Sequence, residues 1–167
     1  NNFFKFFIDI FPINNTEEKC LLESINNYYY PTIRIIDAIV DRKIYPKFNL
    51  LYFSFILREN AIRKLHTLFP DDSIFWDYYD KYQNECINAT LLESKKHFGS
   101  ITEYSLTEFN SISKGKSALA KFIPTGMALL NNNISHISSI EESLDYFAFA
   151  LQMRDDIKDW KEDFLQK

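Results

Sequence analysis

The spacing of apolar residues constrains the fold of this chain more than any other feature. From Glu17 onward, apolar side chains recur three and four positions apart, which gives a helix one buried stripe, and strand-like alternation is hardly seen. The 167 residues include only three glycines and five prolines, against sixteen Phe and ten Tyr. So few turn residues beside so much bulky surface disfavour sandwiches, barrels and glycine-rich nucleotide folds. We therefore expect an all-α fold, a bundle of helices joined by short connections.

Capping residues, prolines and glycines divide the periodic pattern into helices. Pro31 fits either the end of one helix or the first turn of the next, and Pro70 ends another, because the residue before proline avoids helical dihedrals. Ser139 and Glu142 have capping-box spacing, which predicts that the last helix begins near Ile140. The expected helices cover residues 17–30, 32–43, 48–68, 74–97, 105–130 and 140–164, the fifth bent where a glycine and a proline weaken its backbone ladder.

Length and charge exclude several classes of protein. The chain is long enough for one domain over residues 1–167, either whole or a fragment that lacks further C-terminal helices, since it begins without Met and stops at Lys167 inside a helical pattern. A net charge of -4 creates no basic field for nucleic acid. The longest apolar runs, such as residues 49–57, are too short to cross a bilayer, and no leader peptide is evident. We expect a cytoplasmic protein with no transmembrane segment and no nucleic-acid partner.

The last predicted helix carries the strongest chemical signal. Five of the twelve residues from Gln152 to Asp163 are acidic. On a helix, Ala148, Gln152, Asp155 and Asp159 fall within a sector of about 80° together with Glu162. Neighbouring carboxylates repel each other unless water or a cation separates them, and Mg²⁺ is a hard cation that prefers oxygen ligands. The alternative is a solvated acidic face paired with Arg154, Lys158 and Lys161.

A second acidic pair lies in the second predicted helix. Asp37 and Asp41 are four residues apart on one face, and Arg34 lies one turn before them. Their neighbours in sequence are mostly isoleucine and valine, and a buried charge has to be paired or to bind a cation. The pair therefore suggests a second set of metal ligands. The alternative is a surface salt bridge between Asp37 and Arg34.

A lysine among small residues lies between the two acidic segments. Lys116 stands in the run Ser113-Lys114-Gly115-Lys116-Ser117, where small side chains allow close approach of another helix or of a ligand. Its ammonium group could then bind phosphate oxygens. A lysine in contact only with water is the competing interpretation.

The order of these motifs resembles the class I isoprenoid synthases, which include the trans-prenyl diphosphate synthases and the squalene and phytoene synthases. The resemblance covers residues 30–163. Residues 152–159 (QMRDDIKD) are similar to the second aspartate-rich motif of prenyl diphosphate synthases, and Lys116-Ser117 stands where those enzymes have Lys-Thr. Residues 37–41 (DAIVD) are closer to the Asp-x-x-x-Asp motif of squalene and phytoene synthases. The chain therefore resembles a divergent or truncated member.

The resemblance implies a fold and a role for each motif. In this family a helical bundle surrounds a central apolar cavity, and aspartates on two facing helices bind several Mg²⁺ ions that bridge the substrate diphosphate. Carried over, Asp37, Asp41, Asp155 and Asp159 would be the metal ligands and catalytic residues. Arg34, Lys116 and Gln152 would bind the diphosphate.

The implied activity is that of a transferase of isoprenoid biosynthesis. Such a prenyltransferase ionises an allylic prenyl diphosphate and transfers the prenyl group to an acceptor. A terpene cyclase, or terpene synthase, needs the same metal site, so the aspartates do not distinguish the two. Two alternatives outside catalysis stay open: a noncatalytic prenyl-diphosphate-binding or regulatory subunit, and a helical interaction domain. The resemblance also suggests a homodimer.

Overall fold

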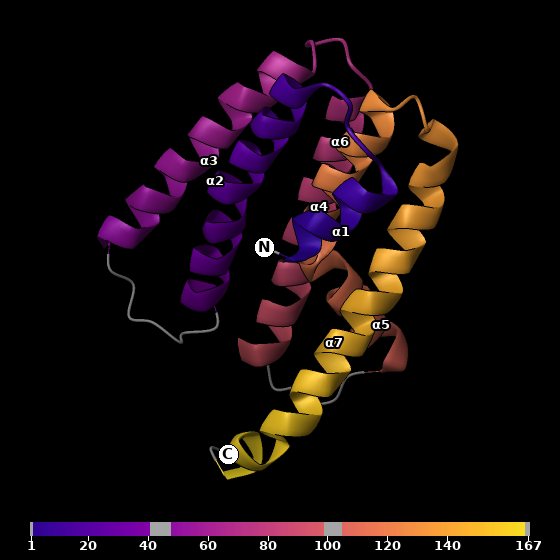
Figure 1. The fold of residues 1–167 in the computed structure, drawn as a ribbon. Coiled ribbons are helices and arrows are strands. Elements are labelled where there is room, and N and C mark those ends of the chain that lie inside the picture. The colour runs from indigo at the N-terminus through magenta and orange to yellow at the C-terminus, as the bar shows by residue number, and fades with distance from the viewer. Residues whose placement is uncertain (1, 41–47, 99–104, 166–167) are drawn as a thin grey trace. The chain divides into compact units, whose positions relative to one another are not determined.

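The computed structural model describes residues 2–40, 48–98 and 105–165, and every secondary-structure element in these ranges is helical. The prediction of an all-α fold is confirmed. The elements, shown in Figure 1, are α1 (Asn2–Ile10), α2 (Thr16–Val40), α3 (Phe48–Leu68), α4 (Phe75–Phe98), α5 (Leu106–Lys116), the 3-10 helix η1 (Ala118–Lys121), α6 (Phe122–Leu130), the 3-10 helix η2 (Ile134–His136) and α7 (Ile137–Leu165).

The chain forms two compact units. The first unit comprises Asn1–Trp76 and Gly126–Asn132, and the second comprises Asp77–Thr125 and Asn133–Lys167. Helices α4 and α6 each begin in one unit and continue into the other. A single domain of the isoprenoid-synthase type around a central cavity stays a prediction.

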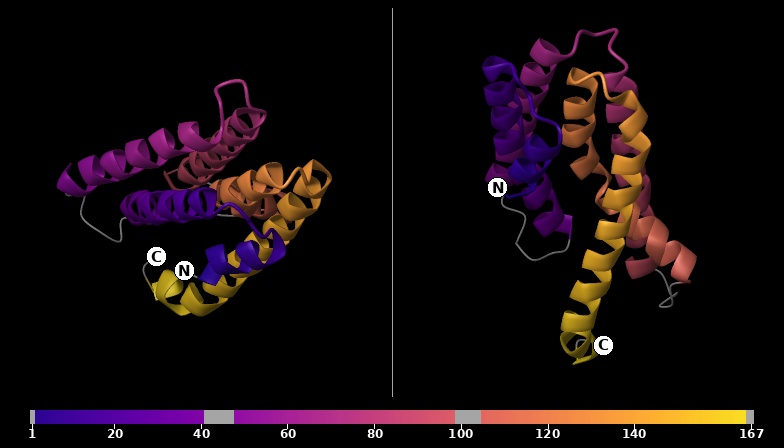
Figure 2. Two further views of the ribbon diagram at one scale, coloured as in Figure 1. Left: turned by 45° about the horizontal axis from the view of Figure 1, so that its top comes forward. Right: turned by 45° about the vertical axis from the view of Figure 1, so that its right-hand side comes forward.

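Helices α2 and α3 form the main pair of the first unit and lie side by side in Figures 1 and 2. They run antiparallel, because the Lys64 ammonium lies 5.8 Å from the Tyr28 ring centroid while the Thr32 hydroxyl donates to the Ser54 carbonyl at 3.3 Å. Apolar residues three and four apart, such as Leu22 and Ile25, are fully buried. The helical spacing of the sequence thus gives α2 its buried stripe.

The prediction of separate helices around Pro31 is wrong, because α2 continues through this proline to Val40. Proline removes one backbone donor and usually breaks a helix. Here Thr32, which is buried, donates its hydroxyl to the Tyr28 carbonyl at 3.1 Å and also reaches Ser54 on α3. This tertiary anchor and the packing against α3 hold the helix together at the proline. At the other end, Asn15 caps α2, since its Oδ1 accepts from the Glu17 amide at 2.9 Å.

The second unit is built on α7, against which α5 and η1 pack. Phe109 on α5 meets Phe149 on α7 edge to face, with ring centroids 5.4 Å apart. Helix α5 also lies close to α4, since a Cβ added at Gly115 would be 2.4 Å from the Ala89 Cβ and 2.8 Å from the Glu85 carbonyl oxygen. Only glycine permits this approach. A capping box between Ser105 and Glu108 begins α5 where the sequence predicted a start.

The predicted single helix over residues 105–130 is instead two helices joined by η1. Helix α5 ends at Lys116, and Ser117, with a φ of -91° and a ψ of 0°, is its C-cap residue. Pro124 then lies in the first turn of α6, where a missing amide donor has little cost.

The start of the last helix also differs from the predicted start near Ile140, since α7 begins at Ile137, directly after η2. Helix α1 was not predicted, because its few residues are too short a window for periodicity.

Candidate functional site

The acidic motif lies on one continuous helix. Because α7 is unbroken from Ile137 to Leu165, Gln152, Asp155 and Asp159 fall within a sector of about 60°. Gln152 is half-buried and Asp155 is exposed, while the side chain of Asp159 lies outside the described part of the chain. The helix therefore supplies the register that the motif requires.

Two members of the motif contact neighbours on their own helix. Arg154 donates to Oδ1 of Asp155 from Nη2 at 2.9 Å and from Nε at 3.1 Å. Gln152 donates its amide to Oδ1 of Asp156 at 2.8 Å. The interpretation of a solvated acidic face paired with Arg154 thus describes Asp155 in this structure. Exposed contacts of this kind are weak, so they leave the carboxylate open to a competing cation.

The first acidic pair belongs to the other unit. Asp37 lies in α2, with a side chain outside the described part, and Asp41 falls outside the described residues altogether. Arg34 is exposed on α2. Since α2 is in the first unit and the acidic part of α7 is in the second, the convergence of the two acidic segments stays a prediction.

Lys116, the predicted diphosphate ligand, has a protein counter-ion. Its Nζ donates to Oε1 of Glu93 on α4 at 3.0 Å, and both side chains are largely buried. The interpretation of a lysine in contact only with water is therefore wrong. The small residues around Lys116 bring α5 close to α4, and Gly115 makes this contact possible.

Sequence reasoning missed a polar network between α4, η1, α6 and α7 in the second unit. At its centre the Lys121 side chain is only 5% exposed, and its ammonium lies 2.6 Å from Oδ1 of Asp145 and 3.3 Å from Oε2 of Glu85. The Asp145 contact is an ion pair without hydrogen-bond geometry, which leaves this buried oxygen with no hydrogen-bond donor among the described residues. Lys121 also lies 5.8 Å from the Tyr82 ring centroid, within reach of a cation–π interaction.

Tyr82 links the two ends of this network. Its hydroxyl donates to Oε1 of Glu141 at 2.7 Å, and Lys81 donates to the same oxygen at 2.7 Å. Because the phenol has one proton, the Thr125 hydroxyl must be the donor in its 2.9 Å contact with the Tyr82 oxygen. Burial raises the pKa of Tyr82 far above its usual value, and Glu141 reinforces this rise against the opposing effect of Thr125. Tyr82 is therefore a neutral donor at any physiological pH.

The charged groups of the network face one another, with three carboxylates against two ammonium groups. Burial tends to lower the pKa of Lys81, but the hydrogen bond and the negative charge of Glu141 outweigh it and raise that pKa. The carboxylates of Glu85, Glu141 and Asp145 face the ammonium groups of Lys81 and Lys121. The network therefore ties α4, η1 and α7 to one another, while the buried Oδ1 of Asp145 has no hydrogen-bond donor among the described residues. Its contacts join residues up to 60 positions apart, a distance at which sequence spacing offers no signal.

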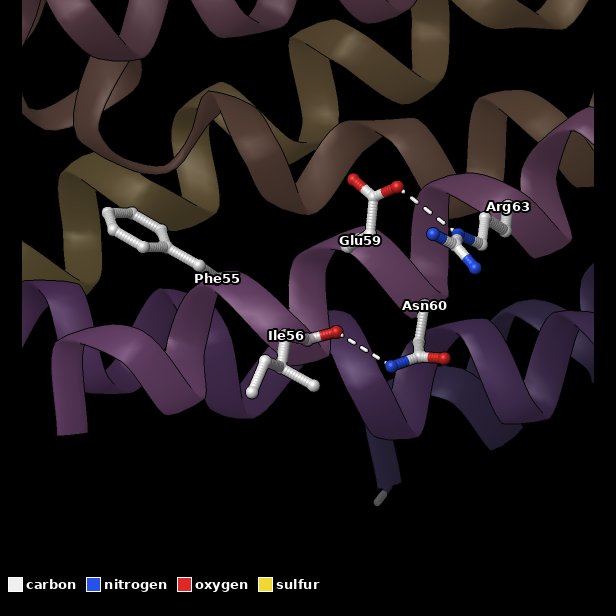
Figure 3. A pocket seen from close by; sticks show the side chains of 5 residues that line it. All are labelled: Phe55, Ile56, Glu59, Asn60 and Arg63. Atoms are coloured by element: carbon white, nitrogen blue, oxygen red, sulfur yellow. Dashed lines mark hydrogen bonds and ion pairs between the residues drawn. The ribbon is translucent and has the colours of Figure 1, made fainter. Parts of the chain in front are cut away.

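No metal cage forms among the described side chains, where no three His, Cys, Asp or Glu residues gather in a geometry that could hold an ion. An open surface pocket lies along α3 and is lined by Phe55, Ile56, Glu59, Asn60 and Arg63 (Figure 3). Figure 3 shows the exposed Glu59–Arg63 ion pair, whose Nε and Oε1 are 3.2 Å apart, beside the two apolar side chains. None of the predicted site residues lines this pocket.

Two further findings bear on the class of protein. Within the described residues, each helix is either too short or too polar to span a membrane. Comparisons with known protein families, curated proteins and solved structures find no match to this chain.

Proposed function

We propose that this chain is a Mg²⁺-dependent class I isoprenoid synthase that ionises an allylic prenyl diphosphate and transfers the prenyl group to an acceptor. The observation that carries the proposal is the uninterrupted helix α7, which keeps Gln152, Asp155 and Asp159 on one face. The all-helical fold and the order of the three motifs along the chain also support it.

The carboxylate oxygens of the proposed site are ligands of the type that Mg²⁺ prefers. Mg²⁺ is usually held by one or two carboxylates and keeps water and phosphate oxygens as its other ligands. Asp155 is exposed and one helical turn from Asp159, so a hydrated ion could reach it once Arg154 turns away. In the proposal Asp37 and Asp41 would hold ions from the other acidic segment. Bound there, Mg²⁺ would neutralise the charge that develops on the leaving diphosphate.

The protein's own cations would complete the site. Lys116 and Arg34 would bind diphosphate oxygens, and Gln152 would orient the group by hydrogen bonds. The allylic carbon–oxygen bond breaks with its electron pair leaving on diphosphate. The resulting carbocation alkylates the acceptor, which then loses a proton. If the same molecule captures the cation, the product is cyclic and the chain is a terpene cyclase.

The test is release of diphosphate. Purified protein is incubated with geranyl, farnesyl or geranylgeranyl diphosphate, with and without isopentenyl diphosphate, in Mg²⁺ or in excess EDTA. We expect release only with Mg²⁺, and a loss of about a hundredfold or more in Asp155→Asn, while the control Glu142→Gln, an exposed acid on the same helix, keeps full activity. Product analysis separates transfer from cyclisation. Absence of release with every substrate contradicts the proposal.

The ion pair between Lys116 and Glu93 favours a second candidate, a noncatalytic subunit that binds prenyl diphosphate. A lysine already neutralised by a buried carboxylate attracts a diphosphate less strongly. This candidate predicts that Mg²⁺ with farnesyl diphosphate raises the melting temperature without turnover, by mass action on the folded state. Because the Lys116 ammonium stays paired with Glu93 in this candidate, the shift should be equal in Lys116→Met and in the control Lys114→Met. A smaller shift in Lys116→Met would show that Lys116 binds the diphosphate.

A further inference from the structure

Helix α7 carries a second apolar stripe, which we call the outer stripe: Tyr146, Ala150, Met153, Ile157 and Trp160. Its members are spaced alternately four and three residues apart, the heptad spacing of a coiled coil, with alanine and isoleucine at positions a and the others at positions d. All five are exposed, and the exposure of the four large side chains lies between 42% and 67%. Phe164 continues the same register in sequence.

The core of the second unit does not bury this stripe, although the Lys114 ammonium of α5 lies 5.9 Å from the ring centroid of Tyr146, its first member. The inner face of α7 buries Ile137, Ile140 and Ala148, and the outer stripe lies on the opposite side, about 160° away around the helix axis. The C-terminal turns of α7 also extend past α5 in Figure 1 and in the right-hand view of Figure 2. A contiguous exposed apolar surface of this kind marks an interaction site.

The charges beside the stripe identify its partner. Arg154 occupies position e and Asp156 position g, and in sequence Lys161 and Asp163 repeat this assignment one heptad later. From Met153 onward one flank of the stripe is therefore basic and the other acidic, while in the preceding heptad Phe147 and Phe149 occupy positions e and g. When two identical helices pair in parallel, position g of each faces position e of the other, so acidic residues meet basic ones. In an antiparallel pair, g faces g and e faces e, so like charges meet.

We propose that two copies of this chain pair in parallel through the outer stripe of α7. Ile157 at position a is β-branched, the residue type found at this position in parallel two-stranded coiled coils. Asp156 of each copy would face Lys161 of the other, five residues further along the partner helix. An isolated coil this short would be marginal, but α7 is already folded against α5 and η1, so pairing does not have to nucleate it.

The contacts now made by the flanking charges do not prevent this pairing. Arg154 bonds to Asp155, and Asp156 accepts from Gln152, in each case between exposed side chains of one helix. Such contacts contribute little and rearrange readily. The face that carries Gln152, Asp155 and Asp159 points away from the outer stripe, so the proposal does not depend on the proposed enzymatic activity.

Sedimentation equilibrium of the whole chain tests the pairing. We expect a monomer–dimer equilibrium, and in Ile157→Glu a dissociation constant at least about tenfold higher, because glutamate would be buried beside its own copy. Ile157 is exposed in the single chain, so the variant should fold, which circular dichroism checks. The matched control is Leu91→Glu, an exposed apolar residue on α4, which should leave the equilibrium unchanged. A wild-type monomer at all concentrations, or an equal effect in both variants, overturns the proposal.

Disulfide formation tests the orientation. In a parallel pair every residue of the stripe faces its own copy, whereas in an antiparallel pair at most one position can do so. We therefore expect Met153→Cys and Trp160→Cys each to give a covalent dimer on oxidation, with the linked peptide identified by mass spectrometry to exclude links through Cys20 and Cys86. Lys158→Cys, on the far side of the helix, should stay monomeric under denaturing conditions. Linkage at only one of the two stripe positions overturns the parallel arrangement.

Discussion

Replacing Lys121 with Met removes the positive charge that the Glu85 and Asp145 carboxylates share. Methionine keeps most of the aliphatic length of lysine, so packing changes little and the electrostatic loss dominates. In this variant Asp145 keeps a buried Oδ1 with no cation beside it. The variant therefore isolates the cost of leaving carboxylates without a partner in the core of the second unit.

The magnitude follows from the exposure of the two carboxylates. Removing one member of a fully buried ion pair costs about 3–5 kcal/mol. The side chains of Asp145 and Glu85 are 21% and 35% exposed, so water can partly solvate both once the ammonium is gone. We therefore expect Lys121→Met to lower the free energy of unfolding by about 2–3 kcal/mol, at the lower end of that range or below it.

Urea denaturation followed by circular dichroism measures this loss, and hydrogen exchange shows whether it falls on the second unit. The control is Arg63→Met, which breaks the exposed Glu59–Arg63 pair on α3 and should cost about 0.5 kcal/mol or less. The double variant Lys121→Met with Asp145→Leu should regain part of the loss, because no unpaired Asp145 charge remains. The reasoning is refuted if Lys121→Met and Arg63→Met cost the same, or if protection falls only in the first unit.

Three further predictions concern residues of the second unit, the last of them compared with a glycine of the first unit. Tyr82→Phe should lower stability by about 1–3 kcal/mol at neutral pH by leaving the buried Thr125 hydroxyl without its partner. Because the pKa of Tyr82 is raised on folding, the wild type should lose about 1.4 kcal/mol per unit as pH rises above about 10, and stability curves at alkaline pH should be flatter in this variant. Gly115→Ala should be destabilising by about 1–3 kcal/mol, since its Cβ meets α4 backbone, whereas Gly126→Ala meets only Phe69 and Phe75 rings and should cost less in the same urea titrations.

Local signals in the sequence predicted the helical class and several helix ends. Spacing of three and four identifies helices without knowledge of the fold, and the Asn15 and Ser105 caps act within three residues. The prediction at Pro31 failed because a tertiary contact decides it: Thr32 bonds to Ser54, 22 residues away. The glycine at position 115 predicted a bend, but the full break at Ser117 was missed because the flanking small residues are compatible with a continuous helix.

In the candidate site, too, features within one helix could be predicted from the sequence, and contacts between helices could not. The shared face of Gln152, Asp155 and Asp159 could be predicted, because it depends only on the periodicity of one helix. The ion pair of Lys116 with Glu93 and the network around Lys121 depend on which helices meet, and no local pattern encodes that. A lysine in a short 3-10 helix looks like a surface residue until α4 and α7 enclose it.

The faces of α7 explain how one helix could serve two independent purposes. Along its inner line, Ile140 and Ala148 are buried, and the same line continues with Asp155 where the core ends. The outer stripe with Ile157 lies opposite, so pairing of two copies would leave the acidic line open to a ligand. Ile157→Glu should therefore weaken the dimer without changing diphosphate release per chain. If the variant lost both the dimer in sedimentation and diphosphate release in the activity assay, one copy would contribute to the site of the other. The two faces of α7 would then not be independent.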